Sequence, residues 1–196
     1  MPGYDEQYSV EKHLFGEPYP EFVAFVRALG IGGNALDLGC GQGRDALMLA
    51  ACGFRVTGID ASRVGIAQMT ERARARGLDV TGVVGDYYLF AFPEDYDAVV
   101  LDSILHFGAD SDRELALLDR VFAHTKAGGH VFIFMQKSRA KERRLKGILD
   151  DLGDDWDLVE DREVDYVYEE SRSGFRSVSQ FAMVVTRRRE REGQDT

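Results

Sequence analysis

The feature that most constrains the fold is a regular alternation of short apolar runs and helix-period segments along the middle of the chain. Five of the apolar runs are strand patterns: 35–38, 55–59, 79–84, 96–101 and 130–135. Three helix-period segments lie between them: 44–52, 62–76 and 112–124. Short apolar runs joined to helices by short connections predict a parallel sheet with helices on both faces.

The two ends of the chain add to this pattern in different ways. Apolar residues at helical spacing predict a helix near 22–29, and another helix follows at 138–152. Two long strand patterns then follow, 156–169 and 175–186, joined by 170–174. They predict an antiparallel hairpin, whereas a nicotinamide-binding Rossmann domain would continue with another helix and parallel strand. We therefore expect one domain over 1–196, a Rossmann-like, doubly wound α/β fold whose mostly parallel seven-stranded sheet ends in a C-terminal antiparallel hairpin.

Size and charge limit the possible partners. A chain of 196 residues suits one packed core, and its formal net charge of -10 repels nucleic acid and anionic membranes. The basic run at 139–144 is expected to be a solvated face, and 187–196 a polar tail. With two cysteines and no apolar leader, we expect a cytoplasmic monomer or homodimer that acts on a small molecule, with no nucleic-acid or membrane partner.

A glycine-rich segment, Asp37-Leu-Gly-Cys-Gly-Gln-Gly-Arg-Asp45, lies directly between the first predicted strand and its helix. Ligands of open parallel sheets bind beyond the carboxyl ends of the strands, where glycine lets the backbone turn sharply and approach a ligand. The dinucleotide fingerprint requires a small residue at its sixth position, which Arg44 occupies here. The segment therefore predicts a cofactor site and disfavours NAD and FAD.

Three later carboxylates follow strand ends. Asp60 lies about 20 residues after the glycines, where an acid accepts hydrogen bonds from ribose hydroxyls; its alternative role is at the start of the next helix. Asp86, beside Tyr87, suits an adenine amino group or a loop cap. Asp102 ends the fourth strand, where the transferred group is expected. The pattern predicts a bound nucleoside.

These motifs resemble those of the class I S-adenosylmethionine-dependent methyltransferases. The segment 37–43 looks like the family's first motif, Asp60 like its ribose ligand, Asp86 like its adenine-side acid, and 126–129 like the turn before its fifth strand. The resemblance covers 35–135 in register. Within the family, 41–45 and the helix after it are most similar to small methyltransferases grouped with tellurite-resistance proteins. The resemblance implies methyl transfer from S-adenosylmethionine, without a metal ion.

The resemblance also implies roles for individual residues. The backbone of Gly39 and Cys40 would contact the amino-acid part of the cofactor, and Asp37 would orient its ammonium group. Arg44 would lie near the cofactor carboxylate or an anionic substrate, or else form a salt bridge on the helix surface. The predicted cofactor site comprises Asp37, Gly39, Cys40, Gly41, Gly43, Arg44, Asp60, Ala61, Asp86, Tyr87 and Asp102.

The acceptor site is less constrained. His106, just after the fourth strand, is either a general base or a buried structural histidine. The predicted acceptor pocket comprises Tyr8, Tyr19, Tyr88, His106 and Phe107, and residues 1–20 are a candidate lid over the cofactor.

Missing motifs narrow the chemistry. No Asn- or Asp-Pro-Pro-aromatic sequence follows the fourth strand, which argues against adenine and glutamine N-methyltransferases, and no Pro-Cys pair supplies the thiol of a cytosine methyltransferase. Two alternatives to a small-molecule methyltransferase stay open. One is a catalytically silent module that binds the cofactor, and the other, which Arg44 and the hairpin disfavour, is a nicotinamide oxidoreductase.

Overall fold

The protein is described by a computed structural model, which covers residues 4–108, 111–170 and 175–190. Its strands form one sheet in the order β3-β2-β1-β4-β5-β7-β6. The strands are β1 (Gly33–Leu38), β2 (Phe54–Asp60), β3 (Val80–Val84), β4 (Tyr96–Asp102), β5 (Thr125–Gln136), β6 (Trp156–Glu170) and β7 (Phe175–Arg188). The first five strands run parallel, and β7 pairs antiparallel with both β5 and β6. The predicted Rossmann-like sheet with a terminal hairpin is confirmed.

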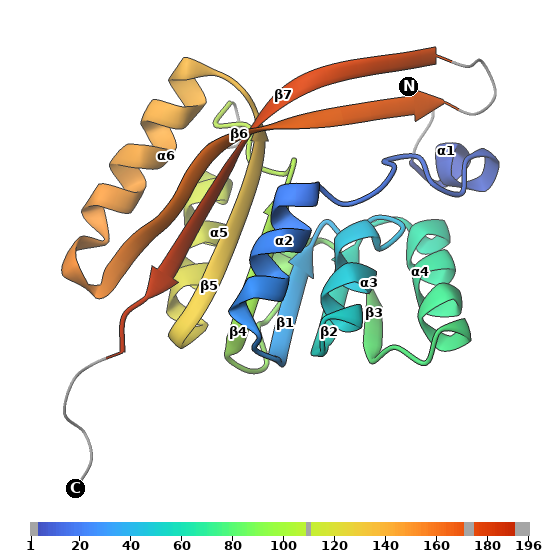
Figure 1. The fold of residues 1–196 in the computed structure, drawn as a ribbon, viewed down its shortest axis with the longest axis horizontal. Coiled ribbons are helices and arrows are strands. Elements are labelled where there is room, and N and C mark those ends of the chain that lie inside the picture. The colour runs from blue at the N-terminus through green and yellow to red at the C-terminus, as the bar shows by residue number, and fades with distance from the viewer. Residues whose placement is uncertain (1–3, 109–110, 171–174, 191–196) are drawn as a thin grey trace, which may run out of the picture.

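The helices cover the two faces of this sheet (Figure 1). They are α1 (Tyr4–Val10), α2 (Pro20–Leu29), α3 (Arg44–Ala51), α4 (Arg63–Ala75), α5 (Ser111–Ala123) and α6 (Arg139–Asp151), with short 3-10 turns at η1 (Tyr87–Leu89) and η2 (Gly153–Asp155). Helices α2, α3 and α4 lie on one face, and α5 and α6 lie on the other. In the described part of the chain, no helix has the length and apolar character needed to cross a membrane.

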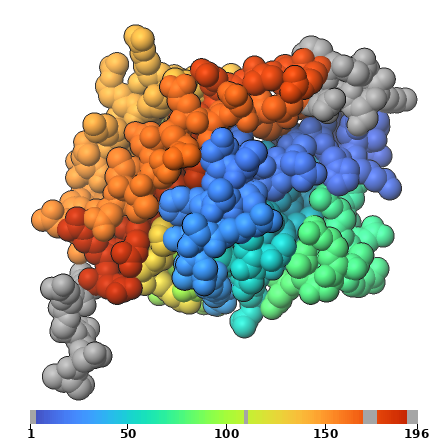
Figure 2. Space-filling model, in the orientation of Figure 1, coloured from blue at the N-terminus to red at the C-terminus, as the bar shows by residue number. Residues whose placement is uncertain are grey.

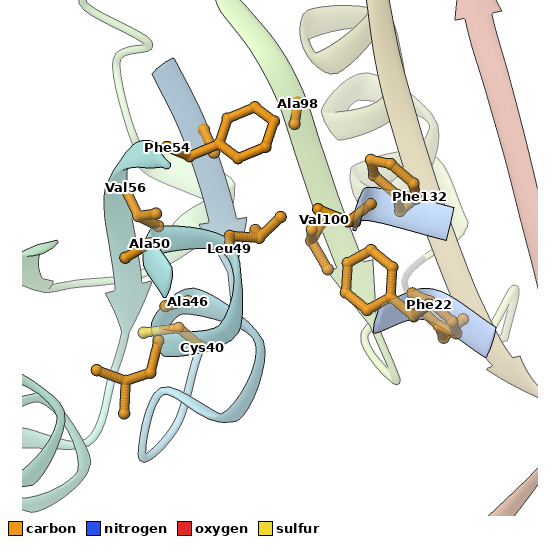
Figure 3. Close-up of a cluster of buried hydrophobic side chains, with 14 of the residues drawn as sticks. Phe22, Cys40, Ala46, Leu49, Ala50, Phe54, Val56, Ala98, Val100 and Phe132 are labelled. Atoms are coloured by element: carbon orange, nitrogen blue, oxygen red, sulfur yellow. The ribbon is translucent and has the colours of Figure 1, made fainter. Parts of the chain in front are cut away.

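Alternation along the strands divides the core into two layers. Ala98 and Val100 of β4 face α2 and α3, whereas Val99 and Leu101 face α5. Figure 3 shows the first layer, where side chains of α3 point toward the sheet and Phe22 of α2 packs near Phe132. Because strands covered on both faces bury every side chain, the central strands read as continuous apolar runs.

The fifth strand differs from its prediction. It begins at Thr125 rather than His130, and its pairing with β4 jumps from Tyr96↔Thr125 to Ala98↔His130. The turn that the resemblance implies at 126–129 is therefore a bulge within β5. A Cβ on Gly129 would lie 3.0 Å from the carbonyl oxygen of Tyr96, so the bulge packs too closely for a side chain. The predicted connection 170–174 lies largely outside the described residues.

The hairpin of β6 and β7 reaches beyond the sheet. Its inner half extends the sheet next to β5, and its outer half crosses over the carboxyl ends of the parallel strands toward α1 (Figure 1). Figure 2 shows the orange atoms of the hairpin next to the blue N-terminal segment on this side of the molecule. A Cβ on Gly16 would lie 3.6 Å from the carbonyl oxygen of Val167, which places 11–19 beside β6. The hairpin and the N-terminal segment therefore enclose the end of the sheet where ligands are expected.

His130 on β5 is expected to make the fold sensitive to acid. The residue is 4% exposed, and among the described residues its Nδ1 has no hydrogen-bond partner. Burial, with a smaller contribution from Arg187, lowers the pKa of His130 to about 4. The unfolded chain, whose histidine has a pKa of about 6.5, then binds the proton first as pH falls, so the folded state loses stability between about pH 6.5 and 4.

We expect His130→Phe to reduce this loss by on the order of 1 kcal/mol. The measurement is urea unfolding of both proteins near pH 7 and near pH 4.5, because the other titrating groups contribute equally to each. Equal pH dependence of the two unfolding free energies would contradict the assignment.

Candidate functional site

A cavity of about 430 Å³ lies at the carboxyl ends of β1, β2 and β4. The strand order reverses between β1 and β4, so this is the point where open α/β sheets bind ligands. Its wall is formed by Tyr4, Tyr8, His13, Phe15, Gly16, Asp37, Gly39, Cys40, Gly41, Gln42, Arg44, Asp45, Asp60, Arg72, Tyr87, Asp102, Ser103, Ile104, His106, Tyr166 and Phe181. The wall thus combines the glycine loop, three strand ends, the N-terminal segment and the hairpin.

The glycine loop needs its glycines for two reasons. Gly39, Gly41 and Gly43 have φ values of 76°, 51° and 79°, a left-handed region that side chains disfavour. A Cβ on Gly43 would also lie 2.2 Å from Cγ of Met69 on α4. The loop can therefore turn from β1 into α3 while packed directly against α4.

Asp60 fixes the shape of this loop. Its carboxylate accepts hydrogen bonds from the backbone N–H of Gly41 at 2.9 Å and of Ser62 at 2.7 Å. The sequence left open whether this acid binds a ligand or serves the start of the next helix. The structure shows the second role, and it also places the Asp60 side chain in the cavity wall, where each carboxylate oxygen can accept a further hydrogen bond.

Arg44, the first residue of α3, is at the centre of a buried charge cluster. Its guanidinium pairs with Asp45 at 2.8 Å and closely with Asp102 at the end of β4. It also lies over the ring of Tyr19, with its Cζ atom 4.9 Å from the ring centroid. The salt bridge that the sequence left open as an alternative is therefore present, but it lies in the cavity wall and not on the helix surface.

Asp37, on β1, is the most deeply buried acid of the wall at 2% exposed. Among the described residues, its Oδ2 atom has no hydrogen-bond partner. Burial, followed by repulsion from Asp45 and Asp102, raises the pKa of Asp37 well above its usual range. A carboxylate oxygen of this kind is ready to accept a hydrogen bond from a cationic ligand.

The N-terminal segment is attached to the glycine loop through Gln42. The Gln42 side-chain oxygen accepts from the backbone N–H of Leu14 at 3.0 Å, and its amide donates to the carbonyl of Glu11 at 2.7 Å. At the start of α4, the Asp5 carboxylate accepts from the Ser62 hydroxyl and from the backbone N–H of Val64. Residues 4–16, which belong to the candidate lid predicted over 1–20, form a helix and a loop whose side chains line the cavity.

The loop after β4 carries His106 into the wall. The buried carboxylate of Glu114 on α5 accepts from the backbone N–H groups of His106 at 2.7 Å and Phe107 at 2.6 Å. The His106 side chain is exposed and lines the cavity, which excludes the buried structural alternative. Sequence reasoning missed Glu114, since only the fold reveals that its helix packs beneath this loop.

The hairpin contributes two further residues that sequence reasoning missed. Tyr166 of β6 and Phe181 of β7 line the cavity, with ring centroids 5.2 Å apart. They lie more than 60 residues after Asp102 in the chain, and no motif marks them. Only the antiparallel pairing Val164↔Phe181, which crosses over the strand ends, brings them to the site.

The predicted residues divide into two groups. Ten lie in the cavity wall: Tyr8, Asp37, Gly39, Cys40, Gly41, Arg44, Asp60, Tyr87, Asp102 and His106. Six lie outside the described wall: Tyr19, Gly43, Ala61, Asp86, Tyr88 and Phe107. Among the second group, Tyr19 packs beneath Arg44, and Asp86 accepts from the backbone N–H of Tyr88 and pairs with Arg113 at 3.1 Å.

Comparison with known proteins identifies the core of the chain. Residues 35–129 match the model of a methyltransferase domain. The cypemycin N-terminal methyltransferase of Streptomyces sp. is 36% identical over 103 residues, which are 52% of this chain and 41% of that protein. The probable S-adenosyl-L-methionine-dependent methyltransferase TehB of Haemophilus influenzae is 31% identical over 100 residues, 51% of this chain and 35% of TehB.

A third relative and a solved structure are also methyltransferases by name or share the fold of this chain. The 2-heptyl-1-hydroxyquinolin-4(1H)-one methyltransferase of Mycobacteroides abscessus is 34% identical over 91 residues, which cover 46% of this chain and 40% of that protein. The matches thus span about two fifths of each relative's length. The crystal structure of Haemophilus influenzae TehB superposes with a TM-score of 0.73 at 23% identity, over 95% of this chain and 67% of that one. These matches confirm the resemblance of residues 35–129 to the methyltransferase domain of the class I S-adenosylmethionine-dependent methyltransferases, and the superposition confirms the shared fold.

Proposed function

We propose that this chain transfers a methyl group from S-adenosylmethionine to a small-molecule acceptor. The observation that carries the proposal is the cavity at the switch point of the sheet. One space there is lined by the glycine loop, by Asp60 and by Asp37. Asp60 has the position expected of a ribose ligand, and Oδ2 of Asp37 has no hydrogen-bond partner in the described part of the chain. The glycine loop lets the protein backbone approach the cofactor closely. The acids suit the ribose and the ammonium group of the cofactor.

Each residue has a distinct proposed role toward the cofactor. Asp60 accepts from the ribose hydroxyls, Asp37 accepts from the ammonium group, and the backbone of Gly39 and Cys40 contacts the amino-acid part. Tyr87 packs beside the adenine. The cofactor, when bound, supplies a methyl group already activated by its sulfonium. The protein then needs mainly to orient the acceptor and exclude water.

The N-terminal segment and His106 complete the proposal. Residues 4–16 act as a lid that keeps water from the cavity, with Gln42 and Asp5 as its attachment points. His106 takes the proton of an acceptor that must lose one, because its side chain lines the cavity and imidazole is the side chain that most often serves as a general base.

A small acceptor fits the size of the site and the names of the relatives. A cavity of about 430 Å³ lies in the range of small-molecule sites, and the net charge of -10 opposes a nucleic-acid substrate. The Mycobacteroides abscessus relative is named for a hydroxyquinolone, and the Streptomyces relative for the N-terminus of cypemycin. We place this activity in the cytoplasm, in a monomer or homodimer.

Thermal unfolding with separate additions of S-adenosylmethionine, S-adenosylhomocysteine, NAD and NADP tests the cofactor assignment. A ligand at about 100 times its dissociation constant adds roughly 2.7 kcal/mol to the unfolding free energy. Stabilisation by the two sulfur nucleosides alone is expected. Stabilisation by NAD or NADP alone would favour an oxidoreductase. Release of S-adenosylhomocysteine in the presence of an acceptor then separates an enzyme from a silent binding module.

Asp60→Ala is expected to weaken S-adenosylhomocysteine binding by about 10- to 100-fold, because charged hydrogen bonds contribute roughly 1.5–3 kcal/mol. The measurement is the dissociation constant from isothermal titration. Asp79→Ala is the matched control, since Asp79 is an exposed carboxylate at the opposite end of the sheet. An unchanged dissociation constant in Asp60→Ala would remove Asp60 from the ribose site.

A further inference from the structure

The cavity wall carries more negative than positive charge. Its described acids are Asp37, Asp45, Asp60 and Asp102, and its guanidinium groups are those of Arg44 and Arg72. Arg44 is the shared cation of three of these acids. It pairs directly with Asp45 and Asp102, and its charge also acts on Asp37. When all these carboxylates are ionised, the wall has an excess of two negative charges.

The proposed cofactor balances only one of them. S-adenosylmethionine has a sulfonium, an ammonium and a carboxylate, and thus one net positive charge. Burial raises the pKa of Asp102 to about 6, against the lowering effect of Arg44 and with a further rise from Asp45. The raised pKa values of Asp37 and Asp102 mean that these acids tend to keep their protons, and a positive ligand beside Asp102 would stabilise its ionised form.

The surroundings of Asp102 show where this second cation would bind. Arg44 lies over the Tyr19 ring, and Tyr19 is 6.2 Å from both Tyr166 and Phe181 between ring centroids. Tyr166 and Phe181 line the cavity next to this charge cluster. A carboxylate beside aromatic faces is the environment that binds organic ammonium groups.

Two buried oxygen atoms also point to a polar ligand. Oδ2 of Asp37, in a side chain 2% exposed, and the hydroxyl of Tyr166 are both without a hydrogen-bond partner among the described residues. Both side chains line the cavity. Buried polar atoms are costly to leave unpaired, so their presence indicates a polar ligand. The Asp37 oxygen can accept a hydrogen bond, and the Tyr166 hydroxyl can donate or accept one. One partner for Asp37 is the cofactor, whereas Tyr166 lies on the hairpin side of the cavity.

We propose that the acceptor is an amine, bound as its ammonium form between Asp102 and the rings of Tyr166 and Phe181. The ammonium gives one proton to His106 before transfer, and the nitrogen lone pair then attacks the methyl carbon as the bond from that carbon to sulfur breaks and S-adenosylhomocysteine leaves. This inference rests on the proposed function and names its substrate class. An anionic acceptor is disfavoured because Arg44 already pairs with two carboxylates. A neutral alcohol would leave the excess negative charge uncompensated.

The test is isothermal titration of the protein saturated with S-adenosylhomocysteine, which cannot donate a methyl group. Three probes of similar shape are compared: 2-phenylethylamine, 2-phenylethanol and 3-phenylpropionate. We expect the amine to bind at least about 10-fold more tightly than the other two. Binding of the alcohol or the carboxylate with equal or higher affinity would overturn the inference, as would amine binding weaker than about 10 mM.

Amine binding by single-residue variants tests which side chains form the proposed ammonium site. Asp102→Asn should weaken amine binding by about 10- to 100-fold, while the exposed control Asp79→Asn leaves it unchanged. Tyr166→Leu, which removes the ring and the hydroxyl, should weaken amine binding more than Tyr166→Phe, which keeps the ring and removes only the hydroxyl. An Asp102→Asn protein that binds S-adenosylhomocysteine normally and the amine with unchanged affinity would overturn the assignment.

The same titrations separate this inference from the proposed function. Failure of the wild-type protein to bind S-adenosylhomocysteine would contradict the methyltransferase proposal itself. Normal binding of S-adenosylhomocysteine together with a preference for the carboxylate probe would contradict only the amine acceptor.

Discussion

Arg44→Met should lower the unfolding free energy by about 3–5 kcal/mol at neutral pH. Methionine retains much of the apolar stem but removes the cation that Asp45 and Asp102 share, and Asp37 lies in the same cluster. Three carboxylates would then be buried around one another with no partner charge. Removing one partner of a buried ion pair is costly for this reason, even where the intact pair adds little stability.

The loss should depend on pH in a defined direction. Without Arg44, the folded-state pKa values of Asp37 and Asp102 rise further above those of the unfolded chain. Groups with raised pKa values favour the folded state at low pH, where they are protonated, and this contribution is lost as pH rises through the folded pKa. The deficit of Arg44→Met should therefore be largest near pH 8 and shrink toward pH 4, as measured by urea unfolding.

Arg55→Met provides the matched control for this experiment. Arg55 pairs with Asp79 at 3.5 Å on the surface, where the two side chains are 66% and 70% exposed. Such pairs contribute about 0–1 kcal/mol. Equal effects of the two substitutions, or a deficit in Arg44→Met that does not change with pH, would show that Arg44 does not hold the cluster together.

Gly43→Ala is expected to destabilise the fold by about 2–5 kcal/mol and to weaken cofactor binding. The φ of 79° makes any side chain unfavourable by roughly 1–2 kcal/mol, and a Cβ placed 2.2 Å from Met69 forces α4 or the loop to move, at a further cost of about 1–3 kcal/mol. The loop lines the proposed cofactor site, so this movement also disturbs the ligand contacts.

Gly77→Ala separates the two causes. Gly77 has a similar φ of 63°, but nothing lies within 4 Å of its Cβ position. It should lose only about 1–2 kcal/mol and bind S-adenosylhomocysteine normally. Urea unfolding and isothermal titration of both variants provide the comparison. Equal unfolding free energies for Gly43→Ala and Gly77→Ala would mean that contact with Met69 does not restrict the loop.

Local sequence signals were sufficient for the elements that form the proposed nucleoside site. The strand before Asp37, the glycine loop and the acid of Asp60 are contiguous in the chain, and parallel strands necessarily bring their carboxyl ends to one edge. The prediction of Asp86 at the adenine stays a prediction, because that side chain caps η1 and pairs with Arg113. An aspartate at the end of a strand can contact a ligand or accept a hydrogen bond from the backbone of the next turn, and the sequence does not distinguish these two roles.

The sequence by itself determined the order of strands and helices along the chain, the terminal hairpin and the glycine loop after β1, because periodicity and glycine placement are local properties. Only the tertiary structure decided which side chains surround the proposed acceptor site. The twist of the hairpin brings Tyr166 and Phe181 over the strand ends, and helix packing turns Arg44 inward to Asp102. These contacts join residues more than 50 positions apart, and which distant side chains share a buried space depends on how the layers pack.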